Sequence, residues 1–97
     1  MPVKLIIDLQ AAPGKGDELT AMFHEVLPDT RSFDGCIDCA VWRNRDDADQ
    51  LSIVETFESR EKYDAYFAWR VEVGTLDQLG ALLAGAPTMR YFDDIGA

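Results

Sequence analysis

Two tyrosines and an arginine recur at helical spacing in the second half of the chain, and side chains of these types can bind and stabilise an anion. Tyr63, Tyr66 and Arg70 are three and four residues apart, so a helix brings them to one face. Phe67 falls on the same face, and Trp69 flanks it. Phenol hydroxyls donate hydrogen bonds, and a guanidinium stabilises negative charge. Two interpretations stay open: a packed aromatic core whose polar ends reach water, or one wall of a ligand pocket.

One carboxylate, Glu55, is predicted to lie on the side of the sheet that faces this helix. It occupies the middle of a predicted strand, and Ile53 and Phe57 point the same way because strand side chains alternate. A buried, unpaired carboxylate or guanidinium is strongly unfavourable, so we expect Glu55 to pair with Arg70 where both are inside. A pocket here would have apolar walls and a few convergent polar groups, as small-molecule sites do.

Other residues with chemical potential carry weaker signals. Cys36 and Cys39 form a C-x-x-C pair, but the pair leads into a predicted strand, where positions three apart face opposite sides. We therefore expect two ordinary thiols rather than a redox pair. His24 is the only histidine, so we predict a surface position and no metal site. The turn at residues 13–16 lacks the spacing of a phosphate-binding loop.

These side chains would be positioned by a βαββαβ series of elements in one domain, residues 1–97. We predict strands over residues 3–10, 36–45, 50–58 and 88–95. We predict helices over residues 17–32 and 60–73, with a short third helix that Thr75 begins and Gly85-Ala86-Pro87 ends. The expected architecture is an α+β domain with a four-stranded antiparallel sheet.

Alternation along the predicted strands divides the sheet into an apolar face and a mixed face. The apolar face must carry the helices, and we place Ile37 and Cys39 on it, with Cys36 opposite. A monomer would leave four hydrophobic residues exposed on the mixed face: Ile6, Trp42, Val54 and Phe92. Because such a patch usually marks an interface, we expect two sheets to pack face to face in a symmetric homodimer.

The composition restricts the class of protein and of partner. A chain of 97 residues is long enough for one domain. Its net charge of −9 repels phosphate backbones and anionic lipids, which disfavours nucleic acid and membrane surfaces as partners. No apolar run approaches the ~18 residues of a membrane span, and the N-terminus does not resemble a signal peptide. We therefore expect a cytoplasmic protein.

The order and spacing of several short segments resemble the antibiotic biosynthesis monooxygenase family, a group of dimeric α+β barrels that includes quinol monooxygenase-like proteins. The segments are Pro13-Gly14-Lys15, Asp34-Gly35-Cys36, Val54-Glu55-Thr56-Phe57-Glu58-Ser59 and Ala86-Pro87-Thr88-Met89-Arg90-Tyr91-Phe92. The resemblance implies a ferredoxin-like monomer, a dimer that closes a barrel, and a pocket between sheet and helices. It also implies oxidation of a phenolic, quinol or polyketide-like aromatic substrate with O2, without a cofactor or metal, because the substrate anion itself reduces oxygen.

The resemblance also suggests roles for individual residues. Tyr63 matches a family tyrosine and would hydrogen-bond the substrate phenol or its oxyanion, assisted by Tyr66. Arg70 would stabilise the anion in place of a family arginine that falls near Asp77. Tyr63 and Arg70 would thus act in catalysis. The expected substrate-binding residues are Tyr66, Phe67, Trp69, Glu55, Phe57 and Ile53.

Departures from the family pattern leave other functions open. Ile53 and Phe57 stand where the aromatic-polyketide oxygenases carry Asn and Trp. Haem-degrading relatives need an Asn, a Trp and a His, and the corresponding positions hold Ile7, Tyr66 and Leu76, so we do not expect haem degradation. The alternatives are a non-catalytic small-molecule-binding or stress-related dimeric domain and a structural dimer with a filled core.

Overall fold

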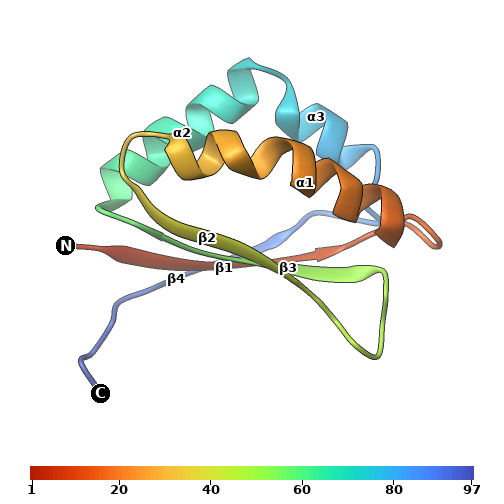
Figure 1. Cartoon of the computed structure of the whole chain (residues 1–97), viewed down its shortest axis with the longest axis horizontal. Helices are drawn as coiled ribbons and strands as arrows, with labels where there is room; N and C mark the ends of the chain where they lie inside the picture. Colours follow the sequence, from red (N-terminus) through yellow and green to blue (C-terminus); the bar gives the residue numbers. More distant parts are fainter.

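The chain forms a four-stranded sheet with all of its helices on one face, as Figure 1 shows. A computed structural model describes all 97 residues, Met1–Ala97. The elements are β1 (Val3–Gln10), α1 (Gly16–Ser32), β2 (Cys36–Arg43), β3 (Gln50–Phe57), α2 (Arg60–Glu72), α3 (Thr75–Gly80) and β4 (Thr88–Phe92). The predicted βαββαβ order and α+β class are confirmed. No helix combines the length and apolar character that crossing a membrane requires.

The strands lie in the order β2-β3-β1-β4, and every neighbouring pair is antiparallel. This order places β1 and β3 at the centre, where both of their edges are paired. Glu55 on β3 lies opposite Leu5 on β1 and Cys39 on β2, so it occupies the middle of the sheet. A carboxylate in that position can reach water only through a gap on the side of the helices.

A bulge near the start of β2 corrects our assignment of faces. Cys36 lies opposite Phe57 and Asp38 lies opposite Thr56, so Ile37 is an extra residue without a partner. Ile37 is 54% exposed, whereas both Cys36 and Cys39 pack against the core on the helix side. The prediction that the two cysteines face opposite sides was wrong, because a bulge shifts the alternation by one residue. Both cysteines are free thiols.

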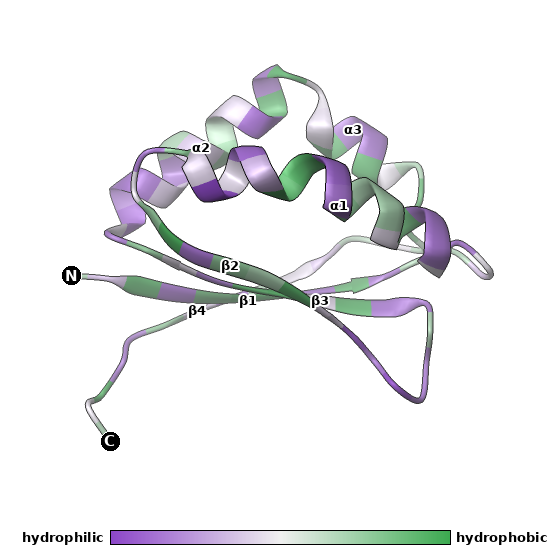
Figure 2. Ribbon diagram, in the orientation of Figure 1, coloured by the Kyte–Doolittle hydropathy of each residue, from purple (hydrophilic) through white to green (hydrophobic).

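β2 and β4 end before the predicted boundaries. The chain leaves β2 after Arg43 because the Asn44 side chain accepts hydrogen bonds from the backbone N–H groups of Asp46 and Asp47, at 2.8 and 3.2 Å. This local pairing replaces the strand ladder and starts the β2–β3 turn. In Figure 2 the strands alternate between hydrophobic and hydrophilic residues, whereas this turn is mostly hydrophilic.

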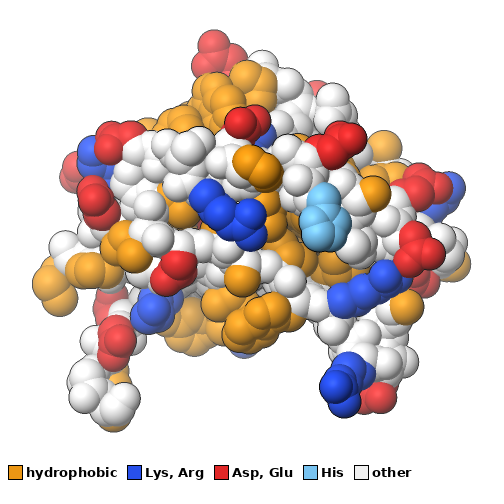
Figure 3. All heavy atoms as spheres, in the orientation of Figure 1, with side chains coloured by type: hydrophobic (Ala, Val, Ile, Leu, Met, Phe, Trp, Pro, Cys, Tyr) orange, Lys and Arg blue, Asp and Glu red, His pale blue; other side chains and the backbone are white.

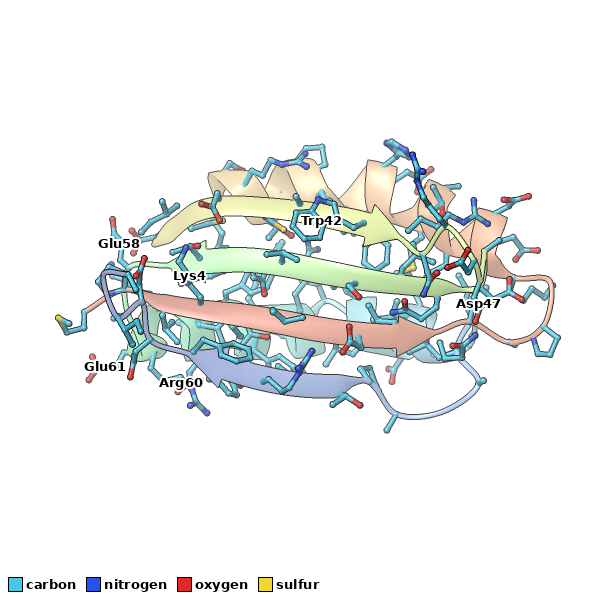
Figure 4. All side chains as sticks on the ribbon, turned by 90° about the horizontal axis from the view of Figure 1, so that it is seen from below. Lys4, Trp42, Asp47, Glu58, Arg60 and Glu61 are labelled. Atoms are coloured by element: carbon cyan, nitrogen blue, oxygen red, sulfur yellow. The ribbon has the colours of Figure 1, made fainter.

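The core lies between the sheet and the helices. Its largest fully buried side chains come from the central strands and α1: Phe57, Leu5, Leu9, Leu19, Leu51 and Thr30. The opposite face of the sheet is uncovered, and Trp42 and Phe92 are 64% and 41% exposed there. Figure 4 looks onto this face and shows Trp42 and Lys4 projecting from it. The C-terminal residues after β4 extend to the same side, away from the helices (Figure 1).

The helix that carries the phenols has defined ends. Ser59 is the N-cap of α2 and accepts a hydrogen bond from the backbone N–H of Lys62 at 3.1 Å, as a serine cap does. Gly74 has a φ of 82°, a conformation that favours glycine, and it separates α2 from α3. These ends set the rotation of α2 and direct Tyr63 and Arg70, its two buried residues, toward the sheet and α1.

Candidate functional site

A cavity of about 100 Å³ lies between the sheet and the three helices. Hydrophobic residues, with the two tyrosines counted among them, make up 13 of the 18 that line it. The polar side chains among them come from three helices and one strand: Thr30, Glu55, Tyr63, Tyr66, Arg70 and Thr75. Small-molecule sites have this composition, with apolar walls and a few polar groups that orient the ligand.

The cavity brings together most of the residues that the sequence suggested. Tyr63, Tyr66, Phe67 and Arg70 from α2 line it, as do Glu55 and Ile53 from β3. Two suggested residues lie outside the lining. Phe57 is fully buried beneath the phenols, and its ring centre is 5.2 Å from that of Tyr63. Trp69 packs on Phe33 at 5.3 Å, at the outer side of α2.

Arg70 is buried and is surrounded by neutral oxygens rather than by a carboxylate. Its Nε donates to the Tyr66 hydroxyl at 2.9 Å, and its NH2 group donates to the Val26 carbonyl and to Thr30 Oγ1 at 2.7 and 2.9 Å. A longer bond of 3.3 Å joins NH1 to Thr75 Oγ1. The expected ion pair with Glu55 is not formed, because these acceptors occupy the guanidinium. Arg70 therefore joins α2 to α1 and to α3.

The two phenols of α2 have different surroundings. The Tyr66 hydroxyl accepts from Arg70 and lies 2.7 Å from Thr30 Oγ1. The ring of Tyr63 is held edge-on by Phe57 and Tyr91, but its hydroxyl makes no hydrogen bond to the chain and is not completely enclosed. Burial raises the pKa of both phenols, so both stay protonated at neutral pH and act as hydrogen-bond donors.

Glu55 is the only carboxylate in the lining and is 3% exposed. Its single partner is the Cys39 thiol, which donates to Oε2 at 3.5 Å. Burial raises the pKa of Glu55 to about 7, an effect that the hydrogen bond from Cys39 and the charge of Arg70 partly offset. Both the protonated and the ionised form are therefore accessible near neutral pH. Burial, followed by the charge of Glu55, raises the pKa of the Cys39 thiol, which stays protonated and remains a donor.

Sequence reasoning missed two residues that complete these networks. Thr30 lies among the hydrophobic positions of α1, yet its hydroxyl is fully buried and contacts both Arg70 and Tyr66. Cys39 is the partner of Glu55. Thr30 shares one face of the predicted helix with Phe23 and Val26. Because a polar residue on a buried face requires a hydrogen-bonding partner, this spacing could have predicted a buried hydrogen bond at Thr30. The predicted surface position of His24 is confirmed, and the single histidine is visible at the surface in Figure 3.

A second hollow lies against the outer wall of the cavity. It measures about 390 Å³ and is bounded by α3 and by the loop that leads to β4. Five hydrophobic or proline side chains line both spaces: Phe67, Leu76, Leu79, Pro87 and Met89. These residues form the partition between the cavity and the outside, and α3 carries two of them. No group of three or more His, Cys, Asp or Glu side chains gathers where it could hold a metal ion.

Solved structures with the same fold are numerous, and three illustrate the likeness. Rv0793 from Mycobacterium tuberculosis is 22% identical, with a TM-score of 0.86 over 98% of this chain and 96% of that chain. PA3566 from Pseudomonas aeruginosa is 18% identical, with a TM-score of 0.86 over 97% and 94%. A conserved protein from Methanosarcina mazei Go1 is 16% identical, with a TM-score of 0.85 over 95% and 91%. At these identities the likeness shows a shared fold alone.

The family follows from the sequence match. A comparison with curated proteins finds no match. Residues 2–70, which are more than half of the chain, match the family model described as antibiotic biosynthesis monooxygenase. The ferredoxin-like fold and the sequence match agree, and the chain belongs to the antibiotic biosynthesis monooxygenase family.

Proposed function

We propose that this protein is a monooxygenase that oxidises a phenolic or quinol aromatic compound with O2. The observation that carries the proposal is the unpartnered Tyr63 hydroxyl, which borders an apolar cavity between the sheet and the helices. Family membership gives the reaction class. An aromatic ring would contact the hydrophobic walls, and its hydroxyl oxygen would accept a hydrogen bond from Tyr63.

The reaction requires no electrons from the protein. A phenol with a ring C–H opposite its hydroxyl reacts with O2 to give a quinone and water. The ring supplies four electrons, one oxygen atom bonds to the ring carbon, and the other leaves as water. Ionisation of the phenol comes first because the anion is the stronger reductant. The chain's part is to bind the ring, to hold the phenolic oxygen beside Tyr63, and to stabilise its negative charge.

Arg70 contributes its charge rather than a direct contact in this proposal. Its hydrogen bonds hold α1, α2 and α3 together, but its positive charge lowers the pKa of Glu55 across the cavity. A substrate anion in the cavity would be stabilised in the same way. The cavity of about 100 Å³ is smaller than the ~300–1,000 Å³ of sites for drug-sized ligands. A single-ring phenol or hydroquinone is therefore the preferred substrate over a polycyclic compound.

The test is oxygen uptake with a panel of single-ring and polycyclic phenols and hydroquinones. We expect one O2 to be consumed per quinone formed, with single-ring compounds preferred. Tyr63→Phe should lower kcat/KM about 10- to 100-fold, because one hydrogen bond to a charged oxygen is lost. Tyr91→Phe is the matched control, since that phenol lies outside the cavity lining. Full activity in a combined Tyr63→Phe and Arg70→Ala variant would exclude both residues from the mechanism.

A non-catalytic aromatic-binding domain is the second candidate. The hydrogen bonds from Arg70 to Val26, Thr30 and Tyr66 favour this candidate. A guanidinium whose donors are mostly bound to protein oxygens stabilises the packing of the helices rather than a substrate anion. Binding of a phenol without O2 consumption would support this candidate and contradict the first. Calorimetry under air, with dissolved oxygen recorded in parallel, separates the two.

We also propose that a second copy of the chain covers the open face of the sheet. Ile6, Val54 and the exposed Trp42 and Phe92 border one concave region there. A hydrophobic surface of this kind on a small domain is typical of an interface. Light scattering should give the mass of a dimer, and Trp42→Glu should give a monomer. Val71→Glu, which places the same charge on the exposed side of α2, should leave the dimer intact.

A further inference from the structure

Oxidation of a phenol in this cavity requires a group that accepts the phenol proton. A phenol has a pKa near 10 and stays protonated at neutral pH in water. Burial raises the pKa of the two tyrosines of the cavity and keeps them protonated, and the Arg70 guanidinium offers only hydrogen-bond donors, so none of the three serves as a base. His24 is exposed and does not line the cavity. Glu55 is the remaining group with basic character in the lining.

We propose that the Glu55 carboxylate is the catalytic base that takes the phenol proton, and that the Cys39 thiol positions it. The proposal rests on the proposed function. Glu55 lies at the centre of the sheet, opposite Leu5 and Cys39, so its backbone is fixed by paired strands on both sides. The Cys39 thiol donates to Oε2 at 3.5 Å, whereas Oε1 accepts no hydrogen bond from the chain and is not completely enclosed.

The proton transfer balances without any change of oxidation state. The O–H bond of the phenol breaks, its electron pair stays on the phenol oxygen, and a new O–H bond forms on Glu55. The phenolate accepts a hydrogen bond from Tyr63 and then reduces O2. One oxygen of O2 bonds to the ring carbon opposite, and Glu55 gives the phenol proton to the outer oxygen, which restores the carboxylate. The C–H bond at that ring carbon then breaks, and its electron pair forms the second quinone C=O as the O–O bond breaks. The proton from that carbon joins the leaving hydroxide to give water. A base is most effective when its pKa lies near the working pH, and burial raises the pKa of Glu55 to about 7.

Glu55→Gln tests the base directly, because the amide has nearly the same shape and can still accept from Cys39. We expect kcat/KM for a single-ring phenol to fall about 10²- to 10⁴-fold, while anaerobic binding of the same phenol changes little. The loss should shrink for a substituted phenol that is already ionised at the assay pH, because it needs no base. Unchanged activity, or an equal loss with both phenols, would overturn the role of Glu55.

The role of Cys39 has its own readout. The wild-type kcat/KM should rise with pH to a plateau, with a midpoint near 7 as Glu55 ionises. Cys39→Ala removes a hydrogen bond that favours the carboxylate, so the midpoint should move to higher pH while the plateau is retained. Cys36→Ala is the matched control, because the Cys36 thiol contacts the Asp38 carbonyl rather than Glu55. A midpoint that stays fixed in Cys39→Ala would contradict the positioning role.

A spectroscopic experiment distinguishes failure of the base from failure of the proposed function. Infrared difference spectra of the anaerobic binding of a substituted phenol whose pKa lies near that of Glu55 should show a protonated carboxyl group that appears in the wild type and is absent in Glu55→Gln. Proton transfer without O2 consumption would retain Glu55 as the proton acceptor and reject the monooxygenase. O2 consumption without a protonated carboxyl would reject Glu55 and retain the monooxygenase.

Discussion

Tyr66 and Tyr63 lie one helical turn apart on α2 and line the same cavity, yet their hydroxyls have opposite surroundings. Tyr66 belongs to a closed cluster with Arg70, Thr30 and the Val26 carbonyl, in which each polar group has a partner. Tyr63 and Glu55 form the open part of the cavity, where one thiol is the only partner. The comparison separates polar groups that stabilise the fold from polar groups that remain available to a ligand.

Removal of Arg70 should have the largest effect on stability, because it removes four hydrogen bonds, three of which join α2 to α1 and α3. We expect Arg70→Leu to lower the free energy of unfolding by about 2–4 kcal/mol, measured by urea denaturation. Arg60→Leu is the control on the same helix: that arginine is exposed, its ion pair with Asp64 spans 3.2 Å, and its loss should cost less than about 1 kcal/mol. Equal effects of the two changes would contradict a structural role for Arg70.

Glu55 should make the free energy of unfolding fall as the pH rises. Burial raises its pKa from the ordinary value of 4.5 to about 7, so the folded state holds the proton more tightly than the unfolded chain. Its contribution is fully present below pH 4.5 and is lost as the pH passes through 7, a change of about 3 kcal/mol. Urea denaturation between pH 4.5 and 8 should show this loss in the wild type.

The same pH series with two variants isolates the effect of Glu55 from the other acidic residues. Glu55→Gln should remove most of the decline, because its amide does not titrate. Glu58→Gln, an exposed position three residues later, should retain it. A decline of the same size in Glu55→Gln would show that Glu55 ionises without penalty and is in contact with water.

The smallest and most direct test compares the two hydroxyls. Tyr66→Phe leaves Arg70 Nε without a partner and removes one hydrogen bond of Thr30, so it should lower the free energy of unfolding by about 1–3 kcal/mol. Tyr63→Phe removes a hydroxyl that has no partner in the chain and should change it by less than about 0.5 kcal/mol. For kcat/KM of phenol oxidation the order should reverse, and Tyr63→Phe should cause the larger decrease. The same order in both measurements would remove the distinction between the two regions.

Much of the fold was predictable because it depends on local periodicity. Alternation along the strands defined one apolar face, and helical spacing placed Tyr63, Tyr66 and Arg70 on one face of α2. The bulge at Ile37 was not predictable, because the bulge is defined by how β2 pairs with β3. The position of Cys36 on the helix side follows from that pairing.

The sequence by itself determined that Tyr63, Tyr66 and Arg70 share one face of α2, since side-chain spacing within one helix decides which way each residue points. Only the tertiary structure decided which of these groups are satisfied. Arg70 was expected to form an ion pair with Glu55. Because α1 packs beside α2, the guanidinium instead donates hydrogen bonds to Thr30 Oγ1 and the Val26 carbonyl. The packing of the helices on the sheet decides which groups from distant elements become partners. Here it leaves the Tyr63 hydroxyl without a partner in the chain and leaves Glu55 with one thiol.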